Sequence, residues 1–375
     1  STQVGILCRA TRISSHSQHG VPCDFRAHAI PSNESPPLMP TPATAATIYE
    51  PVKGWAKIPH GIWMKEATSV AVDSDDRVYV FNRGNMPVLV FDSDGNMVDS
   101  WGNETPYDGV DLMKDPYGNM VPRWVGTRFT RAHAITVDHE DNLWLTDDSG
   151  NLMSKTDKKG NTLMTIGTGV PAERQSGEMF NRPTSVTVDP LNGDIFVSDG
   201  YGNSRVHRFD KEGNHLLSWG EPGTDPGQFS LPHNVAMFGD GQVIVCDREN
   251  HRVQVFTTDG ELVKGWHVHK AVAAWGGRGD DTNVYIAEQG PPPVQRGVRN
   301  IGHKIGIYDR DGNVIQKIGA DLPGERPDQF NWLHAVAVDS WGDIYAAEVS
   351  YVEVGRTLDP PRELVSLRKW ARVSG

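Results

Sequence analysis

Residues 184–220 read TSVTVDPLNGDIFVSDGYGNSRVHRFDKEGNHLLSWG, and this stretch decides the fold. Apolar and polar residues alternate in short runs, which is the pattern of half-buried β-strands. Turn sequences such as LNGD and DKEGN separate the runs, and their glycines supply the positive φ angles that tight hairpins require. The stretch therefore predicts a unit of four antiparallel strands.

Five other parts of the chain repeat this unit. The strand–turn–strand core recurs at 68–84, 133–149, 233–249 and 334–350, with a weaker copy at 270–290. Hairpins such as FDSDGN, TDKKGN and YDRDGN follow most copies and lead to a strand that often closes on Trp-Gly or Ile-Gly. Six four-stranded units predict an all-β, six-bladed β-propeller, which hides its strand edges by closing into a ring.

The two ends of the repeat predict how the ring closes. After ELVSLRKW the last unit lacks a fourth strand, whereas EPVKGW at 50–55 nearly copies ELVKGW at 261–266, the fourth strand of blade four. We therefore expect residues near 49–58 to complete the last blade. This divides the chain into an irregular N-terminal arm, 1–48, and the propeller, 49–375. A disordered tail is the simpler interpretation of the arm; the alternative is an arm that packs on a neighbouring subunit of a homo-oligomer.

Composition limits the classes of partner. The formal net charge of −12 over 375 residues argues against a nucleic-acid surface, which needs clustered Lys and Arg. No apolar run approaches the roughly 18 residues needed to cross a bilayer, so no membrane partner is expected. No signal peptide opens the given chain, which favours a cytoplasmic location. Three cysteines do not make a disulfide framework: Cys246 lies in an apolar strand, while Cys8 and Cys23 could pair.

One position of the repeat carries histidine in alternate blades. Aligned strand entries give Thr68, His133, Thr184, His233, Lys270 and His334. The innermost strands of a propeller line its channel, so histidines from alternate blades of six approach the axis about 120° apart. Three neutral imidazoles suit Zn²⁺ and leave a fourth position for water or substrate. Another first-row metal would also fit, and the alternative is three separate channel histidines bridged by water.

When the six blades are aligned, each aligned position forms a column of six residues. Two columns further along the repeat differ in how much their residue types vary. An acid follows the histidines by 14 residues and recurs in blades without histidine, which favours a structural role: Asp147, Asp199, Asp247, Glu288 and Glu348. The next column varies, and its arginines, Arg83 and Arg248, come from opposite blades. Guanidinium groups bind carboxylates in a forked geometry, so this pair predicts a carboxylate clamp. Tyr201, one column further on in blade three, is a candidate general base beside the metal.

The segments SLPHNVA at 230–236, VCDRENHRVQVF at 245–256 and the stretch quoted first resemble the peptidyl-α-hydroxyglycine α-amidating lyases, which are six-bladed propellers of NHL-type repeats. The similarity extends over about 60–350. The resemblance implies a catalytic zinc on His133, His233 and His334. It also implies a catalytic Tyr201 and active-site roles for Arg83 and Arg248.

The same resemblance implies a reaction on a small, carboxylate-bearing substrate. The family cleaves the C–N bond of a peptidyl α-hydroxyglycine and releases a peptide amide and glyoxylate. The chain departs from the family at three positions. Ala335 replaces an aspartate that helps to hold a structural calcium, so no axial calcium is expected. Trp332 replaces a methionine, and Gly202 replaces a cysteine. These changes around a retained catalytic set leave open another small α-hydroxy or amide substrate.

Two other functions remain as alternatives. A metal-dependent hydrolase, such as a lactonase or amidase, could use the same propeller, although propeller lactonases usually hold calcium through carboxylate and amide ligands. A non-catalytic NHL interaction module would need no metal. Long insertions at about 102–130 and 290–303 could shape a pocket. Tyr107, Trp124, Arg128 and Arg131 lie in the first insertion and are either substrate contacts or ordinary solvated loop residues.

Overall fold

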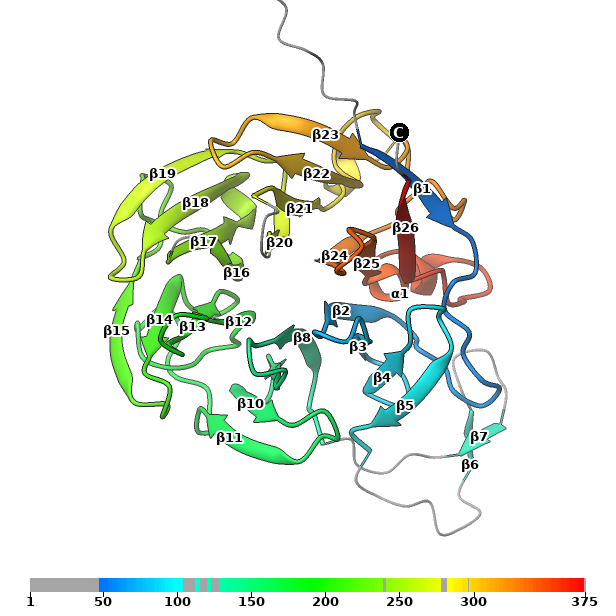
Figure 1. The fold of residues 1–375 in the computed structure, drawn as a ribbon, viewed down its shortest axis with the longest axis horizontal. Helices are drawn as coiled ribbons and strands as arrows, with labels where there is room; N and C mark the ends of the chain where they lie inside the picture. Colours follow the sequence, from blue (N-terminus) through cyan, green and yellow to red (C-terminus); the bar gives the residue numbers. More distant parts are fainter. Residues whose placement is uncertain are drawn as a thin grey trace, which may run out of the picture. The chain divides into compact units, whose positions relative to one another are not determined.

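The computed structural model describes residues 47–103, 112–114, 120–122, 128–238, 241–277, 282–295 and 297–373. Cys8, Cys23, Tyr107, Trp124 and nearly all of the predicted N-terminal arm lie outside these residues. Within the described chain, six four-stranded antiparallel sheets surround a common centre (Figure 1), which confirms the six-bladed β-propeller. In this part of the molecule no helix is long and apolar enough to cross a membrane.

Each of the first five blades runs from its innermost to its outermost strand along the chain. Blade one contains β2 (Ala67–Val72), β3 (Val78–Asn82), β4 (Val88–Phe91) and β5 (Met97–Trp101). Blade two contains β8 (Ala132–Val137), β9 (Leu143–Asp147), β10 (Leu152–Thr156) and β11 (Thr162–Ile166). Blade three contains β12 (Ser185–Val188), β13 (Ile195–Asp199), β14 (Arg205–Phe209) and β15 (His215–Trp219). Blade four contains β16 (Pro232–Phe238), β17 (Gln242–Asp247), β18 (Arg252–Thr257) and β19 (Leu262–His267). Blade five contains β20 (Ala271–Gly276), β21 (Val284–Glu288), β22 (Lys304–Tyr308) and β23 (Val314–Ile318).

Blade six joins the two ends of the propeller. Its order is β24 (Leu333–Val338), β25 (Ile344–Glu348), β26 (Leu367–Val373) and β1 (Ile48–Val52), with Pro51 paired to Trp370. The predicted closure by an N-terminal strand is therefore confirmed. The strand is shorter than expected, because a turn with Gly54 at φ 62° follows it immediately.

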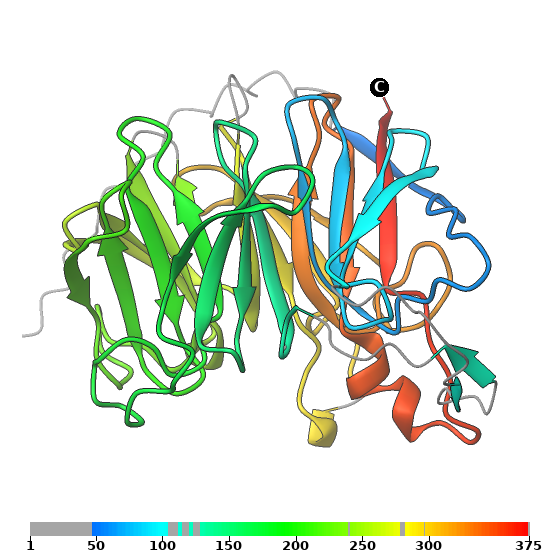
Figure 2. The same ribbon diagram turned by 90° about the horizontal axis from the view of Figure 1, so that it is seen from below.

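Short elements extend the loops between blades. They are β6 (Leu112–Lys114) paired with β7 (Met120–Pro122), α1 (Ser350–Glu353), and the 3-10 turns η1 (Arg248–Asn250), η2 (Pro293–Gln295) and η3 (Gly355–Thr357). Figure 2 shows that α1 and the segment around η2 extend from the same end of the propeller. The turns after β3, β13 and β17 carry Arg83, Tyr201 and Arg248, so turns between strands supply these candidate residues.

Burial decreases from the channel outward. All five residues of β3, β9 and β13 are buried, whereas the outermost β11 is exposed except at the buried Ile166 and the half-buried Met164. The apolar side chains of adjacent blades form shared clusters, as Phe81 of blade one does with Phe129 and Leu145 beside and within blade two. Since each blade covers its neighbour, closure of the ring leaves the second strand of a blade without a solvent-facing side.

A β-bulge interrupts the innermost strand of at least five blades. The register with the second strand shifts after Ala67, Ala132, Pro232, Ala271 and Leu333. A bulge inserts one residue and re-aims its side chain. The inserted residues are Thr68, His133, His233, Val272 and His334. The three predicted histidines thus share one structural position.

The position of the bulge in blade five shows that the sequence-based alignment of this blade is wrong. Val272, and not Lys270, occupies the histidine column there, because the register shift lies between Ala271 and Ala273. The letters KAVA of blade five match HAVA of blade six. A strand has a period of two residues, however, so a shift of two leaves the apolar pattern unchanged. The backbone pairing between β20 and β21, and not sequence similarity to blade six, therefore decides which residue of blade five aligns with the histidines.

Candidate functional site

Three histidines converge at the centre of the propeller. One ring nitrogen from each of His133, His233 and His334 lies within 4.8 Å of those of the other two. The ring centroids are 4.7–5.0 Å apart, and the residues are 1%, 1% and 6% exposed. The bulges bring these side chains from alternate blades to one point. The predicted convergence of alternate-blade histidines is therefore present in the structure.

Backbone carbonyls of the intervening blades fix the orientation of each imidazole. Nδ1 of His133 lies 2.6 Å from the carbonyl oxygen of Thr184, and Nδ1 of His233 lies 2.7 Å from that of Val272. Nδ1 of His334 completes the pattern at 2.6 Å from the carbonyl of Thr68. A carbonyl only accepts hydrogen bonds, so each Nδ1 carries the proton and each Nε2 presents a lone pair to the centre.

The surroundings keep these imidazoles neutral. Burial, followed by the charge of Arg83, lowers the pKa of His334 to about 3. Burial also lowers the pKa of His133 and His233 well below the ordinary value, with further contributions from the neighbouring histidines and from arginines. Neutral imidazoles with Nδ1–H committed to carbonyls are the form that ligates a metal. The donor set therefore fits a divalent transition metal.

Tyr201 faces two of the histidines. Its hydroxyl oxygen lies 3.1 Å from Nε2 of His133 and 3.2 Å from Nε2 of His233. A phenol has one hydrogen, so it can donate to only one of these two lone pairs at a time. In the described chain Nε2 of His334 makes no hydrogen bond. The three Nε2 lone pairs therefore face one another with a single phenol hydrogen to share, and a bound cation would satisfy them.

A glycine places Tyr201 there. The Cβ of any other residue at position 200 would lie 2.2 Å from the carbonyl oxygen of Pro232, the residue before His233. Gly200 thus allows the turn after β13 to approach blade four closely. The guanidinium carbon of Arg182 lies 4.5 Å from the centre of the phenol ring and that of Arg248 lies 5.9 Å from it. Two cations therefore flank the phenol.

Arg248 lies beside the histidine centre with part of its guanidinium free. Its Nε donates to Glu249 at 2.8 Å, while Glu249 also pairs with Lys270 at 3.2 Å. The terminal nitrogens of Arg248 make no hydrogen bond within the described residues. Its charge contributes to the lowered pKa of His233 and His334. It can thus offer two donors to a substrate carboxylate.

Arg83 approaches the centre from the opposite blade but is held more firmly. Its Nη1 lies 2.7 Å from Oε1 of Glu66, and its Nε donates to the carbonyl of Ala132 at 3.1 Å. Oε2 of Glu66, a residue only 1% exposed, accepts the backbone N–H of Val352 at 2.8 Å. A buried ion pair therefore fixes Arg83 in place.

Arg131, Asp148 and Glu66 also belong to this site but are not among the predicted site residues. Arg131 was one of several loop candidates, and its charge acts on all three histidines. It pairs with the fully buried Asp148, which also binds Arg182 at 2.9 Å. Asp148 stands in the variable column beside the arginines, so its position was the available signal. Glu66 carried no signal, because an isolated acid before a strand is common.

The acidic column holds the backbone. Asp147 accepts the N–H groups of Thr130, Arg131 and Gly150 at 2.6–2.8 Å. In blade six, Glu348 accepts Trp332 N–H at 3.0 Å and pairs with Arg368 at 2.6 Å. These bonds pin the loop that enters the innermost strand in blades two and six. They support the structural role that recurrence of the acid indicated.

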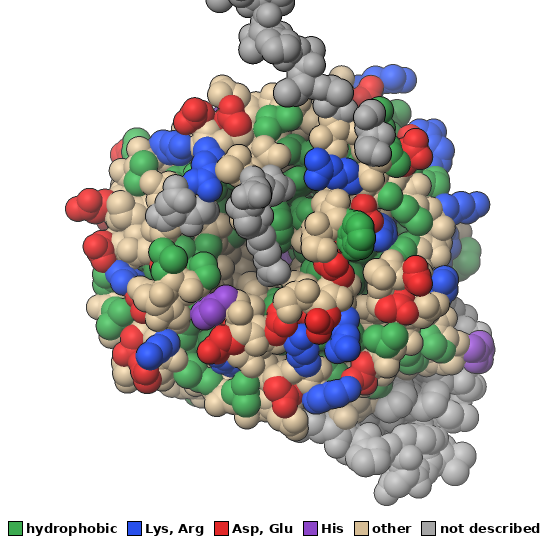
Figure 3. All heavy atoms as spheres, in the orientation of Figure 1, with side chains coloured by type: hydrophobic (Ala, Val, Ile, Leu, Met, Phe, Trp, Pro, Cys, Tyr) green, Lys and Arg blue, Asp and Glu red, His purple; other side chains and the backbone are tan. Residues whose placement is uncertain are grey.

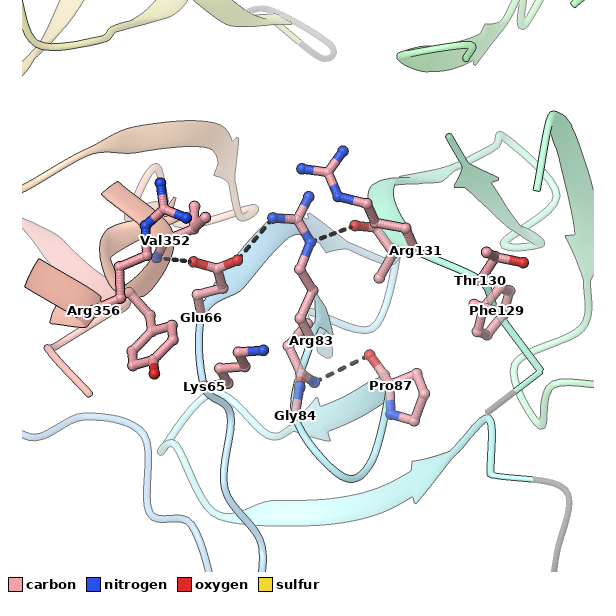
Figure 4. A pocket seen from close by; sticks show the side chains of 13 residues that line it. Lys65, Glu66, Arg83, Gly84, Pro87, Phe129, Thr130, Arg131, Val352 and Arg356 are labelled. Carbon is pink, nitrogen blue, oxygen red and sulfur yellow. Dashed lines mark hydrogen bonds and ion pairs between the residues drawn. The ribbon is translucent and has the colours of Figure 1, made fainter. Parts of the chain in front are cut away.

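A cavity of about 460 Å³ lies beside Arg83 (Figure 4). It lies between the entries to blades one and two and the α1–η3 segment. Its lining residues are Lys65, Glu66, Asn82, Arg83, Gly84, Pro87, Phe129, Thr130, Arg131, Ala132, Tyr351, Val352 and Arg356. The residue after Ala132 is His133, so the cavity and the histidine centre share one strand entry.

The NHL repeat family model matches residues 180–209 and 229–256. Peptidyl-glycine alpha-amidating monooxygenase B of Xenopus laevis is 32% identical over 304 residues, which cover 76% of this chain and 33% of that protein. Peptidyl-alpha-hydroxyglycine alpha-amidating lyase 1 of Drosophila melanogaster is 29% identical over 331 residues, covering 79% and 58%. The solved structure of a streptogramin B lyase shares the fold at TM-score 0.52 and 14% identity, covering 87% and 98%.

The chain is an NHL-repeat, six-bladed β-propeller with three histidines gathered at its centre. Within that class the chain is similar to a relative named as a peptidyl-alpha-hydroxyglycine alpha-amidating lyase, which confirms the resemblance seen in its sequence motifs. It spans about a third of the Xenopus relative and over half of the Drosophila one.

Proposed function

We propose that this protein is a metal-dependent lyase of the amidating-lyase type. It cleaves the C–N bond of a small α-hydroxy substrate that bears a carboxylate. The observation that carries the proposal is the convergence of three neutral Nε2 lone pairs on one point beside Tyr201 and Arg248. The Drosophila relative that bears the amidating-lyase name supports the reaction class.

His133, His233 and His334 would hold the metal, with zinc preferred because three histidines and one open position are typical of catalytic zinc. When bound, such a metal acts as a Lewis acid that makes a nearby hydroxyl more acidic. The fixed Nδ1–H bonds keep the three rings in place. No aspartate follows His334, since Ala335 stands there, and no axial calcium is part of the proposal.

Tyr201 would act as the general base. Removing the proton from the substrate hydroxyl lets its oxygen form a carbonyl, while the C–N bond breaks and its electron pair moves to nitrogen. Protonation of that nitrogen yields the amide, and the other product is glyoxylate. Arg248 would hold the substrate carboxylate with its terminal nitrogens, and Arg83 would face the same substrate from blade one.

The test combines metal analysis with product detection. Metal-replete protein should contain about one equivalent of transition metal, and it should release glyoxylate from α-hydroxyhippurate. Metal-loaded protein that yields no glyoxylate would remove the lyase proposal. If such protein instead hydrolysed a lactone or amide, the hydrolase alternative would gain. Metal well below about 0.3 equivalents would favour a non-catalytic interaction module.

A further inference from the structure

The cavity beside Arg83 is rich in positive charge, although the chain as a whole carries a formal net charge of −12. Four of its lining residues are basic, namely Lys65, Arg83, Arg131 and Arg356, and only Glu66 is acidic. On the face of the molecule seen in Figure 3, acidic and basic side chains are interspersed. A concave site with one sign of charge concentrates ligands of the opposite sign.

Two of the four basic residues have their charge neutralised by the protein. Arg83 pairs with Glu66, and Arg131 pairs with Asp148. Lys65 and Arg356 differ, because in the described chain no carboxylate lies within 4.0 Å of either. The ammonium of Lys65 lies 5.5 Å from the centre of the Tyr351 ring. The cavity therefore contains two positive charges that lack a carboxylate partner among the residues that the structure describes.

The position of the cavity relates it to the histidine centre. Arg83 and Arg131 line the cavity, and both act on the pKa of His133 and His334. Figure 4 shows their guanidinium groups next to each other, with Arg356 on the far side of Glu66. A substrate whose reacting carbon lies at the centre would have to extend past Arg83 to reach the cavity. About 460 Å³ accommodates an acyl group of moderate size.

Apolar surfaces complete the lining. Phe129 and Pro87 form one side and Tyr351 another. Phe129 is only 5% exposed and packs edge-on against Phe81 at 4.8 Å between ring centres, so its position is fixed. Flat apolar surfaces with charged groups beyond them suit a compact acyl group that ends in an anion.

We propose that the natural substrate carries a second carboxylate, on the acyl part that leaves as the amide, and that Lys65 and Arg356 bind it. This inference rests on the proposed function and specifies its substrate as a dianion. Arg248 holds the carboxylate next to the reacting carbon, while the cavity holds the distal one. The distal group would pair with these two cations, which have no carboxylate partner in the described part of the chain.

Two substrates that differ only in the distal carboxylate test this inference. They are α-hydroxyhippurate and its para-carboxybenzoyl derivative, assayed for glyoxylate release. We expect kcat/KM to be about tenfold or more higher for the carboxylated substrate, as charge-assisted hydrogen bonds imply. Rising ionic strength should reduce this preference. Equal kcat/KM for the two substrates would overturn the inference and leave the lyase function intact.

Variants assign the preference to residues. Lys65→Gln combined with Arg356→Gln should bring the ratio of the two kcat/KM values close to one. Arg248→Gln should reduce both values together, because it binds the carboxylate that both substrates share. Lys211→Gln, at a side chain 68% exposed in blade three, should leave the ratio unchanged. A ratio that persists in the double variant would overturn the assignment to Lys65 and Arg356.

Binding without turnover separates this inference from the lyase proposal. Terephthalate carries two carboxylates and benzoate carries one, and neither can react. Calorimetry on metal-loaded protein should show tighter binding of terephthalate, and the double variant should lose the difference. If glyoxylate were never formed but terephthalate still bound through these residues, the lyase proposal would fail and the dianion pocket would stand. Equal binding of the two acids would count against the pocket.

Discussion

His334 donates from Nδ1 to the carbonyl oxygen of Thr68 over 2.6 Å, and this bond joins the last blade of the propeller to the first. The same geometry recurs twice around the ring, from His133 to Thr184 and from His233 to Val272. In each case a bulged histidine contacts the corresponding position of the next blade. The ring that shapes the fold therefore also fixes the tautomers of the candidate metal ligands.

Replacing a central histidine should remove the metal. We expect His334→Ala to lose most bound transition metal, since two imidazoles hold such an ion far less tightly than three. The variant should also unfold more readily, by about 1–3 kcal/mol, because the Thr68 carbonyl loses its donor. Elemental analysis and thermal unfolding measure the two effects.

The control is a buried histidine away from the axis. His207 is fully buried in blade three, where its Nδ1 lies 2.7 Å from the hydroxyl of Ser218. His207→Asn should lower stability while retaining the metal. If both variants kept a full equivalent of metal, the three-histidine site would be wrong.

Removing the Tyr201 hydroxyl should separate catalysis from metal binding. Tyr201→Phe keeps the ring between the flanking arginines Arg182 and Arg248, and it leaves the three Nδ1 hydrogen bonds untouched. We expect full metal content and a loss of about 10²–10⁴-fold in kcat, the range for a general base. Steady-state glyoxylate release measures it. A variant with wild-type kcat would show that the phenol is not the base.

Arg248 is the cleaner test of carboxylate binding. When Arg248 is replaced, Glu249 retains its pair with Lys270, so Arg248→Gln leaves no isolated carboxylate behind. We expect an unchanged melting temperature and an increase in KM of about tenfold or more, the size of a lost hydrogen bond to a charged group. Substrate titration at fixed metal content measures this. An unchanged KM would exclude the clamp.

Much of this arrangement can be read from the sequence, because repeats convert a spacing into a position in space. Six similar units predict the ring, and the alternation of His133, His233 and His334 predicts their convergence. Arg83 and Arg248 stand out only because their column varies among otherwise similar blades. Each inference depends on comparing blades within the one chain.

The remaining features of the site cannot be predicted from the amino-acid sequence, for physical reasons. Every residue has a carbonyl, so the acceptor roles of Thr184 and Val272 follow from strand register and not from residue type. The register of blade five is ambiguous because a strand pattern repeats every two residues. The pair between Arg83 and Glu66 also requires the α1 segment, whose Val352 N–H holds Glu66 from nearly 300 residues away in the chain.

That pair gives Arg83 a structural role in addition to the substrate contact that we propose for it. Arg83→Met would leave Glu66, 2% exposed at its side chain, without its cation. We expect a loss of about 3–5 kcal/mol in the free energy of unfolding, typical of breaking a buried pair on one side. Adding Glu66→Gln should restore part of it, because a neutral amide is less costly to bury. Denaturant unfolding of the single and double variants measures the coupling, and additive effects would contradict a direct pair.

Trp55 should hold the closure of the ring. Its indole lies 5.0 Å from the ring of Tyr345 in blade six and 5.6 Å from that of Phe91 in blade one, and its Nε1 donates to the Ser93 carbonyl at 3.0 Å. The residue is 7% exposed, so Trp55→Ala opens a cavity between the first and last blades. We expect a loss of about 3–5 kcal/mol in the free energy of unfolding. Trp341→Ala removes an indole that is 73% exposed, and it should change stability by less than about 0.5 kcal/mol. Equal effects of the two substitutions in chemical denaturation would mean that Trp55 does not secure the closure.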